Sequence, residues 1–186
     1  MATTSDVHLG SVIRFNGELC VITEYQHRTP GNLRAFYQAK MKNVKTGKSA
    51  EYRFRSGEEV ELVRMEYKKL QYIYKEGEHL VCMDNETFEQ VHIPADLFGE
   101  NARFLKEEMI VKVAFEGDTP IIGDVPTFVE LEVTYTEPGE RGNTATNTLK
   151  AATLETGAVV QVPLFVNIGE IIKIDTRTSG YVGKVK

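Results

Sequence analysis

The chain has 186 residues, of which 41% are hydrophobic and 26% are charged, and this balance excludes an intrinsically disordered protein. Its formal net charge is −5, which by itself argues against a nucleic-acid-binding protein. No apolar run is long enough for a membrane helix, and residues 1–10 lack the pattern of a signal peptide. Cys20 and Cys82 have no metal-type spacing, so we expect a cytoplasmic protein with no membrane contact and no disulfide.

Short alternating segments dominate the first third of the chain. The predicted strands span residues 11–15, 19–26, 34–44 and 49–55, with turns at Asn16-Gly17, Pro30-Gly31 and Thr46-Gly47. Because a closed barrel leaves no exposed sheet edge, these strands favour a small barrel over an open sheet.

Two further runs of predicted strands follow. One comprises residues 61–75, 79–84, 88–93 and 109–115, with a short helix over 94–108, and the other comprises 128–135, 158–165, 170–176 and 181–186. Shifts in charge and the position of Pro126 place boundaries near residues 64 and 126. The prediction is an all-β chain of three consecutive small β-barrels, with domains at residues 1–64, 65–126 and 127–186.

Charge is distributed unevenly over these three segments. Residues 1–64 carry ten Lys and Arg against seven Asp and Glu, whereas residues 65–126 carry six against thirteen. Between Arg28 and Arg55 there are eight basic residues and one acid, Glu51. A local basic face can bind a polyanion whatever the net charge, but a solvated charged surface explains the composition equally well.

The sequence TPGN, at residues 29–32, predicts a type II turn. Proline fixes φ at the first central position of such a turn, and glycine accepts a positive φ at the second. Alternating residues on both sides make the stretch a β-hairpin with a projecting tip. Arg28 and Arg34 flank the tip and Asn32 occupies it, so the tip is either a solvated connection or a probe for an anionic partner.

A basic face follows the hairpin tip. Alternation places Lys40 and Lys42 on one side of a strand, where both can meet phosphates. Further cations on the same sub-barrel are Lys45, Lys48, Arg53 and Arg55. Phosphate neutralisation by this face would make affinity fall with salt and would carry no sequence specificity. Phe36 is predicted to pack in the core at the base of the hairpin rather than to stack on a nucleobase.

Patterns for catalysis and metal binding are scarce. The four histidines are scattered, without cysteine or carboxylate partners at ligand spacing, and there is no phosphate-binding loop or nucleophile elbow. Glu130 and Glu132 share one face of a predicted strand, but without a companion acid–base group we interpret them as solvent-facing. The sequence therefore predicts no enzyme, no metal site and no cofactor.

Four stretches of the chain carry a family resemblance. They are TPGNLRAF (29–36), MDNETFEQ (83–90), FVELEVTYTEPGERGNTAT (128–146) and the tail TLKAATLETGAVVQVPLFVNIGEIIKIDTRTSGYVGKVK (148–186). The tail resembles the C-terminal signature of bacterial elongation factor P. The other three resemble, in order, the hairpin loop, the middle domain and the start of the third domain of that family. The resemblance covers nearly the whole chain.

The resemblance implies a fold and a function. The first domain would be SH3-like, of the KOW type, and the other two would be OB folds, in an L-shaped molecule with the outline of a tRNA. Such a translation elongation factor would be a monomer. It would bind the 70S ribosome between the P and E sites by contacting ribosomal RNA. It would promote peptide-bond formation at consecutive prolines by positioning the peptidyl-tRNA, while the ribosome remains the catalyst. The loop facing the P-site tRNA would comprise Arg28, Pro30, Gly31, Asn32, Leu33 and Arg34.

Two loops depart from the family pattern. Many members carry at the tip a Lys or Arg that is extended by a post-translational modification, whereas this chain has Asn32, which offers neither an amine nor a guanidinium. We hypothesise that the tip works unmodified, with Leu33 stiffening the loop. In the third domain, the family has a Gly-Asp-Thr-type loop that faces the E-site codon. This chain has Gly142-Asn143-Thr144 at that place, so the side chain can still form hydrogen bonds but carries no charge.

Two alternatives stay open. One is a paralogue of the same family with a narrower role. The other is a β-rich protein-interaction module that uses its acidic second barrel as the interface. Kinship to the archaeal and eukaryotic initiation factor that carries hypusine is disfavoured, because that group usually lacks the third barrel.

Overall fold

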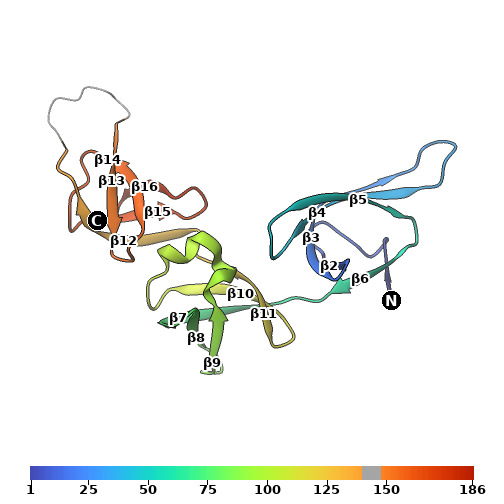
Figure 1. Ribbon diagram of the computed structural model, residues 1–186, viewed down its shortest axis with the longest axis horizontal. Coiled ribbons are helices and arrows are strands. Elements are labelled where there is room, and N and C mark those ends of the chain that lie inside the picture. The colour runs from blue at the N-terminus through green and yellow to red at the C-terminus, as the bar shows by residue number, and fades with distance from the viewer. Residues whose placement is uncertain (140–147) are drawn as a thin grey trace. The chain divides into compact units, whose positions relative to one another are not determined.

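The computed structural model describes residues 1–139 and 148–186 and contains three separate sheets (Figure 1). The chain divides into two compact units. The first unit contains Met1–Tyr67 and Ala114–Ile122, and the second contains Lys68–Val113 and Gly123–Lys186. Strands make up most of the described chain, so the all-β prediction is confirmed.

The first sheet has the strand order β1-β6-β2-β3-β4-β5. Its strands are β1 (Ala2–Thr3), β2 (Val12–Phe15), β3 (Glu18–Arg28), β4 (Phe36–Asn43), β5 (Ser49–Arg55) and β6 (Glu59–Val63). Antiparallel hairpins join β2 to β3, β3 to β4 and β4 to β5, as the turn residues predicted. Alternate residues of these strands point inward and form a core that includes Ile13, Ile22, Met41 and Phe54.

The second and third sheets each contain five strands, in the orders β11-β10-β7-β8-β9 and β14-β13-β12-β15-β16. The second is built from β7 (Glu66–Glu76), β8 (His79–Asp84), β9 (Gln90–Pro94), β10 (Ile110–Glu116) and β11 (Thr119–Asp124). The third is built from β12 (Phe128–Thr136), β13 (Leu149–Leu154), β14 (Val159–Pro163), β15 (Ile171–Asp175) and β16 (Gly180–Lys184). In the third sheet β14 also contacts β16, so this sheet curls back on itself.

A 3₁₀ segment, η1 (Ala95–Phe104), follows β9 and is interrupted at Gly99, whose φ is 59°. The helix predicted over 94–108 is therefore shorter and less regular than expected. The last residue of η1, Phe104, is fully buried in a core otherwise made by β12–β15 and the chain between them. Arg103 Nη2 donates to Ser179 Oγ at 2.8 Å, which fastens the same end of η1 to the third sheet.

Several strands differ from the sequence-based prediction. The strand predicted over 61–75 is two strands, β6 and β7, separated at residues 64–65. Strands β11 and β13 were not predicted, because TPIIGD contains Pro and Gly and LKAATL contains no β-branched residue except Thr153. Cys20 and Cys82 are free and buried, and burial raises the pKa of both thiols, that of Cys82 to about 11. No helix within residues 1–139 and 148–186 is long and apolar enough to cross a membrane.

Candidate functional site

The loop between β3 and β4 contains the residues predicted to form the hairpin tip. Strand pairing runs outward as far as Arg28 and Phe36, which leaves residues 29–35 as the connection. The Leu33 amide donates to the Pro30 carbonyl at 3.1 Å, so the turn is centred on Gly31 and Asn32. Gly31 does not have a positive φ. The predicted type II turn over 29–32 is therefore wrong: the connection is longer than a tight hairpin turn, so the Pro-Gly pair does not dictate its geometry.

The tip is exposed to solvent. Residues 31–34 are all exposed, and the Leu33 side chain is 75% exposed. Any stiffening of the loop by Leu33 must therefore come from its backbone hydrogen bond to Pro30 and not from side-chain packing. The exposed loop is free to enter a partner's surface without first breaking side-chain contacts of its own.

The inner face of the hairpin carries a stack of aromatic rings. The Tyr25 and Tyr37 rings are 5.0 Å apart and nearly parallel, and His27 stacks on Tyr37 at 4.6 Å. The Tyr25 hydroxyl donates to the Thr4 carbonyl at 2.6 Å. This stack runs from the core toward the tip, and it ties the base of the hairpin to the N-terminal segment.

Replacing Tyr25 by phenylalanine is expected to lower the free energy of unfolding by about 1 kcal/mol at neutral pH, because the Thr4 carbonyl loses its donor. Burial also raises the pKa of the Tyr25 phenol from 10.0 to about 12. A raised pKa means that the folded state holds the proton more tightly, so this stabilisation is complete below pH 10 and disappears between pH 10 and 12. Urea unfolding at both ends of that range measures the effect. A Y25F difference that persists unchanged at pH 12 would contradict this assignment.

The outer face of the hairpin is divided into an arginine half and a lysine half. Near the tip, Arg28, Phe36 and Arg55 lie in one row across β3, β4 and β5, and Arg53 follows opposite Gln38. Farther from the tip, Lys40 lies between Glu24 and Glu51 and forms an ion pair with Glu24 at 3.3 Å. Positive charge on this face is therefore concentrated beside the loop.

Lys40 and Lys42 share the outer face, as predicted, because the residues between and beside them, Ala39, Met41 and Asn43, are buried. Lys45 lies away from this pair, in the exposed turn between β4 and β5. The prediction that Phe36 packs in the core is wrong. Phe36 alternates with the buried residues of β4, so its ring lies on the outer face, where it is half-buried. The guanidinium carbon of Arg53 is 5.2 Å from the centroid of this ring.

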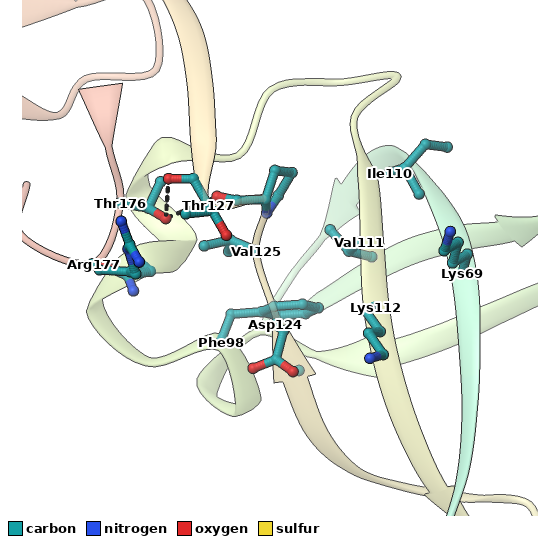
Figure 2. Close-up of a pocket in the computed structure, with 13 residues that line it drawn as sticks. Lys69, Phe98, Ile110, Val111, Lys112, Asp124, Val125, Thr127, Thr176 and Arg177 are labelled. Atoms are coloured by element: carbon teal, nitrogen blue, oxygen red, sulfur yellow. Dashed lines mark hydrogen bonds between the residues drawn. The ribbon is translucent and has the colours of Figure 1, made fainter. Parts of the chain in front are cut away.

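A second feature lies outside every predicted site. A cavity of about 790 Å³ opens in the second unit between β7, β10, η1 and the chain from Gly123 to Thr127 (Figure 2). Its wall includes Lys69, Lys112 and Arg177, and Thr176 Oγ1 donates to the Thr127 carbonyl at 3.1 Å. Arg177 is held by Asp175 through a contact of 2.7 Å. The guanidinium lowers the pKa of that carboxyl, so both groups stay ionised. Because the cavity combines distant segments, no sequence motif marks it.

The carboxylates considered for catalysis are solvent-facing. Glu130 and Glu132 are exposed on β12, alternating with the buried Val129, Leu131 and Val133. Within the described residues, no group of three or more His, Cys, Asp or Glu side chains gathers in a way that could hold a metal ion. The candidate loop Gly142-Asn143-Thr144 lies outside the described residues.

Comparison with known proteins accounts for all three sheets. A model of the elongation factor P KOW-like domain matches residues 3–60, one of the elongation factor P OB domain matches 65–122, and one of the C-terminal region of elongation factor P matches 129–184. The chain belongs to the elongation factor P family. Elongation factor P from Chloroherpeton thalassium is 52% identical over the full length of both chains. The protein of the same name from Chloroflexus aurantiacus is 49% identical over 98% of each.

Membership of this family makes the protein a translation elongation factor, and it confirms a KOW-like first domain followed by an OB domain. Solved structures agree on the fold. Translation initiation factor 5A from Methanococcus jannaschii matches 67% of this chain and 94% of its own, with a TM-score of 0.52 at 18% identity. A translation initiation factor 5A family protein from Naegleria fowleri matches 67% of this chain and 96% of its own, with a TM-score of 0.54 at 16% identity. A third of the chain has no counterpart in these matches.

Proposed function

We propose that this elongation factor binds the 70S ribosome between the P and E sites and promotes peptide-bond formation at consecutive prolines. It would act by positioning the peptidyl-tRNA. Holding the reactants in alignment lowers the activation barrier of peptide-bond formation without any proton transfer by the elongation factor. The observation that carries the proposal is the hairpin. An exposed loop projects beyond a base of stacked aromatic rings, and the outer face of the hairpin carries arginines, which suit the phosphates of an RNA backbone.

In this proposal the loop from Arg28 to Arg34 faces the P-site tRNA, and the basic face of Lys40, Lys42, Lys45, Arg53 and Arg55 contacts RNA phosphates. The tip acts unmodified, because Asn32 has no group that acylation or glycosylation of an amine or guanidinium could extend. Gly142, Asn143 and Thr144 face the E-site codon. The protein acts as a cytoplasmic monomer. An intact mass of the protein from its native source that shows an adduct on residues 28–34 would contradict the unmodified tip.

Co-sedimentation with 70S ribosomes tests the binding part of the proposal. We expect the protein to pellet with ribosomes at low salt and to dissociate progressively as salt rises, because released counterions drive the contact. A module that works through its acidic second barrel would instead stay in the supernatant at every salt concentration. A protein that pellets equally at all salt concentrations would contradict a phosphate-based contact.

A further inference from the structure

The arginine half of the hairpin's outer face has an arrangement that simple phosphate binding does not require. Arg53 lies with its guanidinium carbon 5.2 Å from the centroid of the Phe36 ring, and both side chains are on the solvent side of the sheet. Arg28 and Arg55 lie directly opposite Phe36 on the two neighbouring strands. Phe36 therefore has an arginine directly opposite it on each neighbouring strand, in addition to Arg53 over its ring.

These arginines are available for a ligand. Among the described residues, no carboxylate forms an ion pair with Arg28, Arg53 or Arg55, in contrast to Lys40 and its partner Glu24. Arg28 is oriented by a hydrogen bond of 3.1 Å to the Gln26 side chain, which leaves its other donors free. Three unneutralised cations within two rows of a sheet repel one another, so an anionic group placed among them relieves that repulsion.

A guanidinium held against an aromatic ring is suited to a particular ligand. The Arg53 guanidinium lies over the Phe36 ring, and a planar guanidinium can stack on a second planar group while its N–H edges donate. Unpaired nucleobases stack on aromatic rings and on guanidinium planes, whereas a duplex hides the faces of its bases. A duplex would therefore gain nothing from the plane of Arg53 beyond its charge.

We propose that Phe36 and Arg53 form a stacking platform for one unpaired nucleobase of RNA, with Arg28 and Arg55 contacting the flanking phosphates. Phe36 is a positioning residue that acts through Arg53. The proposal rests on the RNA-facing role of the hairpin proposed above, and it adds the class of ligand: a single-stranded segment, recognised by the plane of a base as well as by its phosphates.

The platform is tested with two variants that leave the net charge unchanged. R53K keeps the cation but loses the plane, and F36L keeps an apolar side chain but loses the ring. The full-length protein is titrated by NMR with single-stranded oligoadenylate and with an RNA duplex that has the same number of phosphates. We expect the wild type to favour the single strand, and each variant to lose about tenfold in affinity for it, with little change for the duplex. The slope of log affinity against log salt should stay unchanged, because the number of cations is the same.

Two further variants serve as matched controls. R64K changes an exposed arginine that does not lie beside Phe36, and F88L changes an exposed phenylalanine in the loop between β8 and β9. Both should bind oligoadenylate as the wild type does, and thermal unfolding checks that F36L is folded. The proposal is overturned if R53K binds the single strand as tightly as the wild type, if the duplex binds equally well, or if neither RNA binds. These outcomes are independent of ribosome co-sedimentation, so a failed platform and a failed ribosome-binding proposal give different results.

Discussion

Replacing Phe104 by alanine is expected to lower the free energy of unfolding of the second unit by about 3–5 kcal/mol. The Phe104 side chain has no exposed surface, and it packs among Val129, Leu131 and the other core residues of the third sheet, although it belongs to η1. The substitution removes a whole ring and leaves a cavity that the surrounding strands close only in part. Urea unfolding followed by far-UV circular dichroism measures the loss.

Phe88 supplies the matched control for this substitution. It lies in the same unit, in the loop between β8 and β9, but its side chain is 72% exposed. F88A should change the free energy of unfolding by no more than about 0.5 kcal/mol. Hydrogen exchange adds a second reading, because F104A should speed exchange of amides in β12 and β15 while leaving those of β3 and β4 unchanged. If F104A and F88A were equally stable, Phe104 would not have the core role that we assign to it.

Neutralising Arg53 and Arg55 together is expected to weaken association with ribosomes by at least about tenfold at moderate salt. The slope of log association constant against log salt concentration should fall in magnitude by about 2. The reason is the unequal surroundings of the cations on the outer face. Arg53 and Arg55 flank Phe36 without carboxylate partners among the described residues, whereas Lys40 lies between Glu24 and Glu51. A cation already neutralised by carboxylates gains less from a phosphate.

The double variant K40Q/K42Q is the matched comparison for R53Q/R55Q, because each removes two positive charges from the same face. We expect K40Q/K42Q to weaken association by less than about threefold. Glutamine also avoids the repulsion that a new acid would create beside Glu24 and Glu51. Co-sedimentation over a series of salt concentrations measures both variants. Equal losses would mean that the face acts only through its total charge, and a larger loss for the lysines would contradict the division into two halves.

The sequence predicted the parts of this fold that depend on local pattern. Alternation and turn residues identified most strands of the first sheet, and alternation also placed Lys40 and Lys42 on one face. The same rule places Phe36 on that face too, because Phe36, Lys40 and Lys42 have the same parity along β4. The prediction of a core position for Phe36 rested on the hydrophobicity of the ring alone, and it was wrong because the alternation decides the side of the sheet.

Features that depend on distant segments were not predictable from the sequence. Nothing in the composition of η1 shows that Phe104 enters a core made by strands that begin at residue 128. The ion pair of Lys40 with Glu24 depends on the register of β3 against β4, which a bulge between Ile22 and Glu24 shifts by one residue. The contrast between the paired Lys40 and the unpaired Arg53 and Arg55 therefore required the structure.

The rate of triproline peptide synthesis on purified ribosomes, with and without the unmodified recombinant protein, tests the central claim most directly. The proposed positioning of peptidyl-tRNA by an unmodified Asn32 tip predicts a clear acceleration, and no acceleration of a proline-free peptide made in parallel. The variant R53Q/R55Q should lose the acceleration at protein concentrations where the wild type is saturating. An unchanged triproline rate, with the wild-type protein bound to the ribosomes, would contradict the claim.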